Sequence, residues 1–411
     1  MKRREFLKLA GAVSLVGCAT GAPSKARVVV IGGGFGGATA AKYIRHWDPS
    51  IDVVLIERDA GFVSCPISNL VLAGYSTMQE ISHGYDGLRR HGVQVVRDNV
   101  VAVDAAKKSV RLGSGGEIGY ERLIVSPGID FMFNEVAGFQ EAMQAGTVLH
   151  AWKAGPQTVA LRSQLQAMPD GGTYILSVPL APYRCPPGPY ERASMVAAYF
   201  KQAKPRSKVL VLDANPDVTS KGGLFKAAWK DLYPGILEFR GNSKVVGVER
   251  GAVRTEFDTI RGDVLNVVPP HRAGDIAAQA GLITTNNRWC DVDWRTMESK
   301  AVKGVHVLGD ATLSAPAMPK SGSMANNHAK IAAAAIVEQL NGRAPQPVKI
   351  INTCYSFVSQ KEGIRVSSVH EWDGSTLTAV KGSGGVSAAR SEAEGTYAWN
   401  WARAIWADSL T

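Results

Sequence analysis

The segment Val28–Gly37, with the sequence VVVIGGGFGG, carries the strongest signal in this chain. Its β-branched residues predict a buried strand, and Ala38–Ile44 directly after it predicts a helix. Gly32, Gly34 and Gly37 fill the three glycine positions of a G-x-G-x-x-G turn. Such a turn lets backbone approach a pyrophosphate, and the N-terminus of the following helix favours its negative charge. We therefore predict a dinucleotide-binding unit.

A carboxylate follows this turn at the distance that the motif requires. Glu57 lies 20 residues after Gly37, at the end of the apolar run Val53–Ile56, where it would accept the hydroxyl groups of a ribose. Tyr120–Gly128 predicts a further buried strand whose Ser-Pro-Gly turn returns the chain to the dinucleotide. We assign the cofactor-binding residues of this part of the site as Gly32, Gly34, Phe35, Gly37, Glu57, Arg58 and Gly128.

A second strand with a polar end indicates which dinucleotide is bound. Gly304–Asp310 is an apolar segment that closes on Gly-Asp, and a helix is predicted from about Ser321 through the alanines at 332–335. In flavoproteins with two dinucleotide-binding domains, such an aspartate binds the ribitol of FAD, and the next helix points its N-terminus at the flavin. Asp310 together with the glycine turn and Glu57 therefore predicts FAD rather than NAD.

A second α/β unit is predicted over residues 151–268, with strands at Thr173–Val178 and Lys208–Asp213 and a helix at Glu191–Lys201. Lys244–Phe257 alternates like an antiparallel meander, and Asp263–Val268 is expected to lead out of the unit. Proteins of this architecture that use NAD(P)H have another glycine-rich turn after the first strand. Here the junction reads VPLAPYRCPPGPYERA over residues 178–193, and its prolines remove donors that a pyrophosphate needs. We expect no nicotinamide site.

The composition is that of a multi-domain α/β protein. The chain has 411 residues, of which 45% are hydrophobic and 20% are charged. Its formal net charge of +10 is spread along the sequence, whereas a nucleic-acid surface concentrates its charge. We therefore expect no nucleic-acid partner. The basic balance suits either an ordinary solvated surface or attraction of an acidic protein partner.

The first 22 residues are predicted to be a targeting segment rather than part of the fold. The sequence RREFLK at 3–8 matches the twin-arginine export pattern, and a short apolar stretch follows it. This predicts a periplasmic protein that is exported after folding. LVGC at 15–18 also reads as a lipobox, so acylation of Cys18 and cleavage near Ala22 remain alternatives.

Four cysteines follow the signal, namely Cys65, Cys185, Cys290 and Cys354. None belongs to a C-x-x-C or C-x-x-C-H motif, so we predict neither a zinc site nor a haem on this chain. The histidines show no metal-ligand spacing. In an oxidising compartment a disulfide among the cysteines is expected. Cys290 is expected to pack as a small hydrophobic side chain.

The cysteine-bearing segments resemble one family, from Lys25 to the C-terminus. The segments that carry this similarity are VVVIGGGFGGATAAKYI, FVSCPISNLVLAG, HGYDGLRRHGVQVV, HAWKAG, YRCPPGPYERAS, AMPKSG at 317–322 and NTCY at 352–355. They are similar to segments of the flavoprotein subunit of flavocytochrome c sulfide dehydrogenase.

This resemblance implies roles for three cysteines. It implies that Cys65 is joined by a thioether to the 8α-methyl group of FAD, whereas the alternative is a small buried thiol. It implies that Cys185 and Cys354 form a redox-active disulfide over the flavin, which hydrosulfide attacks. A purely structural disulfide between the two is the alternative for that pair.

The resemblance also implies roles for Glu191, Lys320 and Trp401. Glu191 is expected to donate or accept a proton near the disulfide, although an acid in the first turn of a helix also serves as a cap. Lys320 is expected to stabilise negative charge on the reduced flavin, unless it is a solvated loop lysine. Trp401 matches a tryptophan that lies close to the isoalloxazine.

We therefore expect an α/β fold with two Rossmann-like domains of the glutathione-reductase type and a C-terminal interface domain. The predicted boundaries are 25–150 and 269–342 for the split FAD-binding domain, 151–268 for the second domain and 343–411 for the C-terminal domain. The expected activity is sulfide oxidation with electron transfer to a c-type cytochrome subunit. The alternatives are a sulfide:quinone reductase and an accessory flavoprotein of a periplasmic sulfur-oxidising complex.

Overall fold

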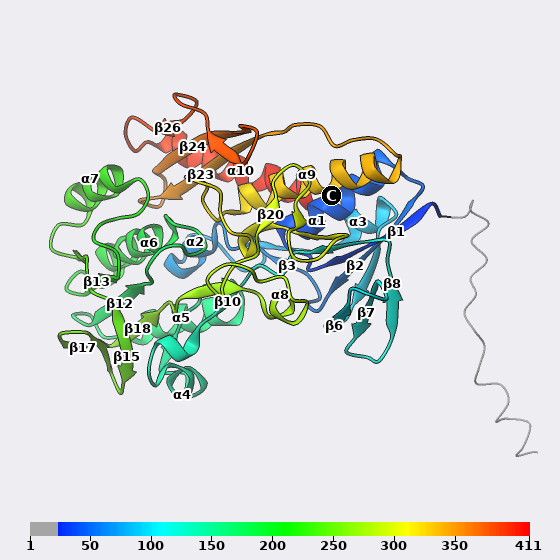
Figure 1. Ribbon diagram of the computed structural model, residues 1–411. Helices are drawn as coiled ribbons and strands as arrows, with labels where there is room; N and C mark the ends of the chain where they lie inside the picture. The colour runs from blue at the N-terminus through cyan, green and yellow to red at the C-terminus, as the bar shows by residue number, and fades with distance from the viewer. Residues whose placement is uncertain (1–23) are drawn as a thin grey trace, which may run out of the picture.

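The computed structural model describes residues 24–411, which form two α/β units and a C-terminal sheet (Figure 1). The predicted export signal and Cys18 lie outside the described residues. No helix within residues 24–411 is long and apolar enough to cross a membrane.

The first unit is built on a seven-stranded sheet. Its strands lie in the order β20 (Val292–Asp293), β21 (Glu298–Ser299), β22 (Val305–Val307), β9 (Arg122–Val125), β1 (Ala26–Ile31), β2 (Ile51–Glu57) and β5 (Gln94–Arg97). The strands from β22 to β5 are parallel, and Val28, Val29 and Val30 of β1 are fully buried. Burial on both faces explains why β1 is a continuous β-branched run.

The second unit is a five-stranded parallel sheet. Its strands lie in the order β11 (Val148–Leu149), β18 (Val264–Val267), β12 (Thr173–Val178), β13 (Lys208–Asp213) and β14 (Leu237–Arg240). The segment Asp263–Val268, which is expected to lead out of this unit, contains β18, the last strand of this sheet along the chain, and all four residues of β18 are buried. An antiparallel sheet follows β14, as the alternation predicts, with strands β15 (Val245–Glu249), β16 (Ala252–Thr255) and β17 (Thr259–Arg261).

Helix α6 (Gly188–Ala203) follows β12 and starts before the predicted residue Glu191. Pro189 belongs to its first turn, where a backbone N–H has no partner within the helix, so the proline costs no hydrogen bond there. Glu191 consequently lies in the first turn of α6, as predicted. Helix α9 (Gly322–Leu340) begins where the sequence predicts, because the Ser321 side chain accepts a hydrogen bond from the Met324 amide and caps it.

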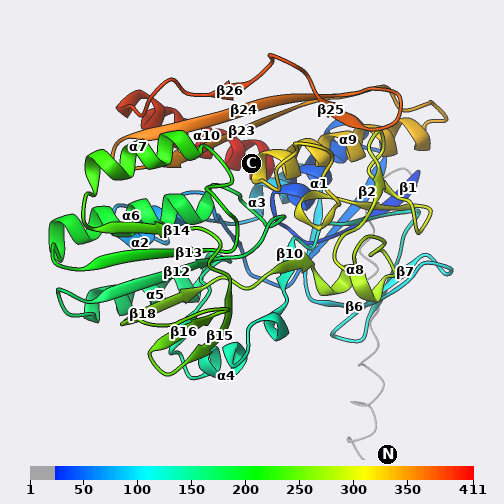
Figure 2. The same ribbon diagram turned by 60° about the vertical axis from the view of Figure 1, so that its left-hand side comes forward.

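The C-terminal sheet spans both units (Figure 2). Strands β23 (Lys349–Phe357) and β24 (Gly363–Trp372) form a long hairpin, paired from Lys349 with Glu371 to Phe357 with Gly363. Strand β23 packs against α9 of the first unit and α6 of the second. The short strands β25 (Leu377–Ala379) and β26 (Gly385–Val386) complete this sheet. It therefore delivers residues of β23 to the junction of the two units.

Helix α10 (Glu392–Leu410) returns the chain to the first unit and packs against α1 (Phe35–Trp47). Ser409 accepts a hydrogen bond from Thr39 of α1 at 2.9 Å, and Asp408 accepts one from Tyr43 at 2.6 Å. One turn earlier, the Trp406 indole donates to the Ser64 hydroxyl at 2.9 Å. The last helix thus contacts both the helix of the glycine turn and the segment that contains Cys65.

The remaining elements are short or connect the units. They are α2 (Ser68–Ala73), α3 (Asp86–Arg90), α4 (Phe139–Gln144), α5 (Pro156–Ala167), α7 (Gly222–Leu232), α8 (Asp275–Gln279), β3 (Phe62–Val63), β4 (Ser82–His83), β6 (Val100–Asp104), β7 (Ser109–Leu112), β8 (Glu117–Gly119), β10 (Ile129–Phe131) and β19 (His271–Ala273). Strands β10 and β19 pair with each other where the chain passes between the units.

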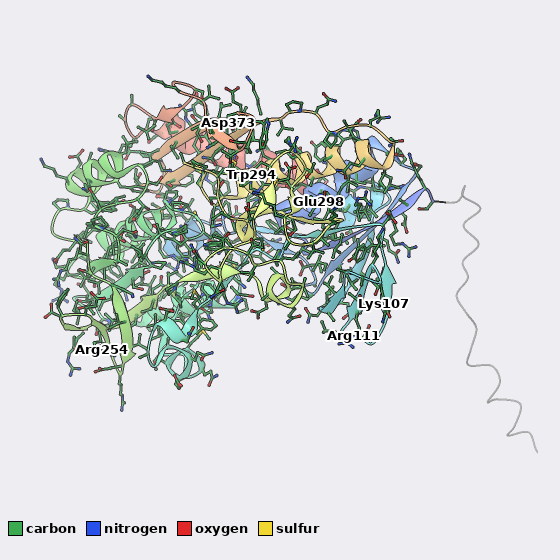
Figure 3. The ribbon with its side chains drawn as sticks, viewed as in Figure 1. Lys107, Arg111, Arg254, Trp294, Glu298 and Asp373 are labelled. Carbon is green, nitrogen blue, oxygen red and sulfur yellow. The ribbon has the colours of Figure 1, made fainter. Side chains whose placement is uncertain are left out.

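The basic side chains are distributed over distant parts of the surface. Lys107 and Arg111 lie on the β6–β8 sheet at one end of the molecule, whereas Arg254 on β16 lies at the other end (Figure 3). Arg254 pairs loosely with Glu249 at 3.9 Å, and Lys107 lies 3.5 Å from Asp104. This distribution agrees with the spread of positive charge along the sequence.

Candidate functional site

The glycine turn after β1 forms a cradle whose packing excludes side chains on one side and leaves space on the other. Gly32 has φ +95°, and a Cβ there would lie 2.4 Å from the Ser126 carbonyl oxygen. A Cβ on Gly37 would lie 1.9 Å from the Gly32 carbonyl oxygen. At Gly34, by contrast, a Cβ would meet nothing within 4 Å. The turn therefore has the close backbone packing and the open side that a bound pyrophosphate requires.

Glu57 lies at the end of β2 and faces this turn. Its Oε2 accepts a hydrogen bond from the Gly33 amide at 2.6 Å, and its Oε1 accepts one from the Asp59 amide at 2.9 Å. The Gly33 amide therefore fixes the carboxylate next to the cradle. Gly128, with φ +65°, also has open space where a side chain would be. The neighbouring Arg58 is exposed and lies 4.0 Å from Asp59.

Phe35 is the first residue of α1, and its ring packs against Gly322, the first residue of α9. A Cβ on Gly322 would lie 2.9 Å from the Phe35 ring, and the ring packs edge-on against Phe62 at 4.9 Å between centroids. Phe35 therefore joins the two helix N-termini that face the predicted dinucleotide. This is a packing role beside the cradle.

Asp310 is a buried carboxylate with an unused oxygen. It follows β22 in the short 3₁₀ helix Gly309–Ala311, and its Oδ1 has no hydrogen-bond partner among the described residues. Burial raises the pKa of this carboxyl. A buried polar atom without a partner is costly, and a hydroxyl group of a ligand would satisfy it. The residue thus fits the role that the sequence assigns to it.

Lys320 lies next to Asp310 but is buried rather than solvated. Its ammonium donates to the carbonyl oxygens of Asp310, at 3.1 Å, and of Thr312, and it lies 3.7 Å from the centre of the Trp289 ring. Burial lowers the pKa of Lys320 to about 7. Cys290, which is fully buried, is close enough for Lys320 to lower its pKa, although burial raises that pKa to about 12. The alternative of a solvated loop lysine is therefore wrong.

The structure brings Cys185 and Cys354 together from different parts of the chain. Cys185 lies between β12 and α6 with φ +58°, and Cys354 lies on β23. Burial raises the pKa of the Cys185 thiol, and the nearby charges of Cys354 and Glu191 raise it further. All four described cysteines are free thiols, so the expected disulfide stays a prediction. The Cys185 amide donates to the Lys320 carbonyl oxygen at 2.8 Å, which joins the cysteine pair to the dinucleotide site.

Glu191 is held beside this pair by two donors. Its Oε1 accepts a hydrogen bond from the Phe357 amide at 2.8 Å, and its Oε2 accepts one from Asn69 at 2.7 Å. Burial raises the pKa of the Glu191 carboxyl, although both hydrogen bonds lower it. A buried carboxyl with a raised pKa close to two thiols is suited to proton transfer.

Sequence reasoning missed Lys221, which is also part of the cysteine cluster. Its ammonium donates to the Ser356 hydroxyl at 2.8 Å and to the Cys354 carbonyl oxygen at 3.3 Å. Burial lowers the pKa of Lys221 to about 8. Nothing in the segment Ser220–Gly223 distinguishes this lysine from an ordinary loop lysine, so no sequence signal was available. Asn69, which positions Glu191, was missed for the same reason.

Cys65 and Trp401 contact different neighbours in the structure. Cys65 is partly buried, and its sulfur lies 3.5 Å from the Ala154 nitrogen and 3.7 Å from the Trp152 oxygen. Trp401 packs beside Tyr355, the neighbour of Cys354, with 6.4 Å between ring centroids. A different tryptophan of α10, Trp406, contacts the Cys65 segment through Ser64.

Comparisons with known proteins agree with this geometry. Residues 26–158 match the pyridine nucleotide-disulphide oxidoreductase family. Residues 158–269 match the central domain of the sulfide dehydrogenase [flavocytochrome c] flavoprotein chain, and residues 346–410 match the flavin-binding domain of flavocytochrome c sulphide dehydrogenase. The sulfide dehydrogenase [flavocytochrome c] flavoprotein chain of Chlorobaculum thiosulfatiphilum is 64% identical over 45 residues, which are 11% of this chain and 94% of that sequence. Within these ranges the chain is similar to the flavoprotein of flavocytochrome c sulfide dehydrogenase.

Longer alignments relate the chain to another group. The mitochondrial sulfide:quinone oxidoreductase of Mus musculus is 25% identical over 336 residues, covering 75% of this chain and 71% of that protein. The solved structure of the sulfide:quinone oxidoreductase from Aquifex aeolicus has a TM-score of 0.77 and 18% identity, covering 93% of this chain and 91% of that one. The second comparison confirms the predicted α/β fold class.

The residues of the candidate site fit FAD. The cradle of Gly32–Gly37 and Glu57 would hold the adenosine and pyrophosphate, and the unpaired oxygen of Asp310 would accept a ribitol hydroxyl. Asp310 and Lys320 lie between the second and third matched segments, in a region that none of the three family matches covers. The structure therefore supplies the part of the site that those matches leave out.

Proposed function

We propose that this protein is the FAD-binding subunit of a periplasmic sulfide dehydrogenase, which oxidises hydrogen sulfide and passes the electrons to a c-type cytochrome subunit. The observation that carries the proposal is the placement of Cys185 and Cys354 beside Glu191, one hydrogen bond away from the predicted FAD site at Lys320. Sulfide is the substrate named for both groups of relatives. The export pattern at residues 3–8, which lies outside the described residues, supports the periplasmic location.

The chemistry of the cysteine pair suits a soft sulfur anion. Hydrosulfide attacks one sulfur of a Cys185–Cys354 disulfide, so that a new sulfur–sulfur bond forms, the old one breaks, and the other cysteine leaves as a thiolate. Glu191 is placed to exchange a proton with this cluster, and its two hydrogen bonds fix the carboxyl in position. FAD, when bound, accepts the electron pair that sulfide gives up and passes the electrons on.

The junction between β12 and α6 supports an electron donor other than a pyridine nucleotide. A protein that binds NAD(P)H would have a glycine-rich turn here. Residues 179–187 instead contain four prolines, Pro179, Pro182, Pro186 and Pro187. Prolines have no backbone N–H for a pyrophosphate. Cys185 lies in this junction, at the place where a nicotinamide-binding domain would have its glycine-rich turn. We therefore propose that this part of the chain reacts with sulfide instead of binding a nucleotide.

Sulfide:quinone reduction is the second candidate, and one observation favours it. The alignments that cover most of the chain are with sulfide:quinone oxidoreductases of Mus musculus and Aquifex aeolicus. The two candidates share the cysteine chemistry and differ in the electron acceptor.

The deciding experiment compares acceptors with protein purified from its native source. Sulfide-dependent reduction is measured with cytochrome c and with decylubiquinone, and the haem content of the purified complex is recorded. The proposal expects a co-purifying haem subunit and faster reduction of cytochrome c. Quinone reduction without haem would assign the chain to the second candidate, and the absence of sulfide-dependent flavin bleaching would refute both.

A further inference from the structure

Lys221 places a buried ammonium group at the end of β23, beside the cysteine pair. The residue precedes α7, has φ +55° and is only 7% exposed. Its ammonium is held by the Ser356 hydroxyl at 2.8 Å and the Cys354 carbonyl oxygen at 3.3 Å. Cys354 and Ser356 are two residues apart on β23, so their side chains lie on the same face of the strand. Lys221 therefore approaches the face that carries the Cys354 thiol.

The charge on Lys221 lacks a fixed counter-ion. Within residues 24–411, no carboxylate oxygen lies within 4.0 Å of its ammonium, and both of its hydrogen-bond acceptors are neutral. Burying a cation in this way is unfavourable unless an anion comes close to it. Among the groups that can carry a negative charge, Cys354 raises the pKa of Lys221 most, followed by Glu191 and Cys185, although burial has the larger, opposite effect. A thiolate on Cys354 would therefore compensate the buried charge.

The two cysteines experience different charges. Burial raises the pKa of the Cys354 thiol, Lys221 is the strongest influence that lowers this pKa, and the charge of Asp310 raises it. For Cys185, the charges of Cys354 and Glu191 oppose the thiolate, and Arg184 and Lys221 favour it more weakly. Two further charged groups face the cluster, since Glu394 acts on Lys221 and Arg192 interacts with Cys185. The surroundings thus favour one thiolate over the other.

We propose that Lys221 is a positioning residue that keeps the negative charge of the cysteine pair on Cys354 when the pair is in its dithiol form. This inference rests on the proposed function: when hydrosulfide attacks the disulfide, Cys354 is the cysteine that leaves as a thiolate. The hydrosulfide sulfur then bonds to the Cys185 sulfur, the disulfide bond breaks, and its electron pair stays on Cys354 as a thiolate opposite Lys221. The better-stabilised thiolate is the better leaving group, so the persulfide forms on Cys185.

The test measures the ionisation of each thiol without any need for turnover. Flavin-loaded protein is reduced with dithiothreitol, freed of it and alkylated with iodoacetamide from pH 6 to 10, and the labelled Cys185 and Cys354 peptides are quantified by mass spectrometry. Cys354 is expected to react with the lower pH midpoint. Lys221→Met is expected to raise that midpoint by about one pH unit, which slows alkylation near pH 8 about tenfold. Lys221→Arg keeps the charge and is expected to keep the low midpoint.

Lys204 provides a matched control, because it is also buried, at 8% exposure, and its ammonium is bound by the carbonyl oxygens of Gln166 and Met168. Lys204→Met is expected to leave the Cys354 midpoint unchanged. An unchanged midpoint in Lys221→Met, or a lower midpoint for Cys185 than for Cys354 in the wild type, would overturn the proposal. If Lys221→Met does not fold, Lys221→Gln and the order of ionisation in the wild type still decide the matter. Sulfide-dependent flavin reduction is assayed separately, so its absence would refute the proposed function and leave the alkylation result standing.

Discussion

The Glu191 carboxylate accepts a hydrogen bond from the Phe357 amide at 2.8 Å, although 166 residues separate the two in the chain. This bond joins the first turn of α6 to the end of β23, and therefore joins the segment of Cys185 to the strand of Cys354. The same carboxylate links the two cysteine-bearing segments and is the group for which we propose proton transfer.

Replacement of Glu191 by Gln is expected to slow sulfide-dependent flavin reduction about a hundredfold, because the proton-transferring group is lost. The rate is measured by stopped-flow absorbance between pH 6 and 9, per mole of bound flavin. Glu191→Asp, which keeps a carboxyl, is expected to recover part of the rate. An unchanged rate and pH profile in Glu191→Gln would limit this residue to a structural role.

Replacement of Cys185 or Cys354 by Ser is expected to abolish flavin reduction by sulfide, because the disulfide electrophile is lost. Reduction by dithionite should continue, since it needs no disulfide. The matched control is Cys290→Ser, a buried cysteine outside the pair, which should keep sulfide activity per folded flavin. If both variants of the pair are less stable yet oxidise sulfide normally per flavin, the disulfide is a structural link.

Acid precipitation tests the flavin linkage. The partly buried Cys65 lies in the segment Ser64–Pro66, which α10 contacts through Trp406. We expect FAD to stay with the precipitated polypeptide, and Cys65→Ser to release it into the supernatant. Free FAD from the wild type would show that the linkage is not covalent.

The β12–α6 junction predicts the response to pyridine nucleotides. Neither NADH nor NADPH is expected to reduce the flavin at a useful rate, because prolines and Cys185 take the place of a glycine-rich turn. Sulfide should bleach the flavin within the mixing time of a spectrophotometer. Rapid bleaching by NADH would place the protein among pyridine-nucleotide enzymes.

Buried histidines predict a loss of stability in mild acid. Burial lowers the pKa of His150 and of His328 to about 3 and that of His306 to about 4, compared with 6.5 for an unperturbed histidine. Between pH 6.5 and about 4 the unfolded chain binds protons that the folded chain does not, so the free energy of unfolding falls as the pH falls. Each histidine contributes about 1.4 kcal/mol per pH unit in that range.

The measurement is the melting temperature of the flavin-loaded protein from pH 7 to 4. His328→Asn is expected to make the melting temperature depend less steeply on pH, because one buried histidine no longer contributes. Substitution of the exposed His46 should leave this pH dependence unchanged. A melting temperature that does not fall between pH 6.5 and 4.5 would contradict the prediction.

The fold was predictable where local patterns coincide with burial. The β-branched run of β1, the glycine turn and the Ser321 cap each determine their element through nearby residues, so the sequence located them correctly. The position of β18 was not predictable in this way. A short apolar strand does not reveal where in a sheet it lies, because its partners β11 and β12 are distant in sequence.

The candidate site was predictable only where a motif carries the chemistry. Glu57 and Asp310 follow strands at recognisable positions, and the structure gives both the expected surroundings. Lys221 and Asn69 were not predictable, because their importance comes from tertiary contacts with Ser356 and Glu191. The burial of Lys320 is likewise a tertiary effect, since the segment AMPKSG has the composition of an exposed loop.

Helix α10 has a consequence for the order of events during synthesis. Its residues Trp406 and Ser409 close the first unit against Ser64 and Thr39, but they leave the ribosome after every other element of that unit. A nascent chain that already contains the glycine turn still lacks α10, which packs against the helix after that turn. Assembly of the nucleotide site is therefore completed only after α10 has been synthesised, and a chain shortened before Trp406 would lack these two contacts.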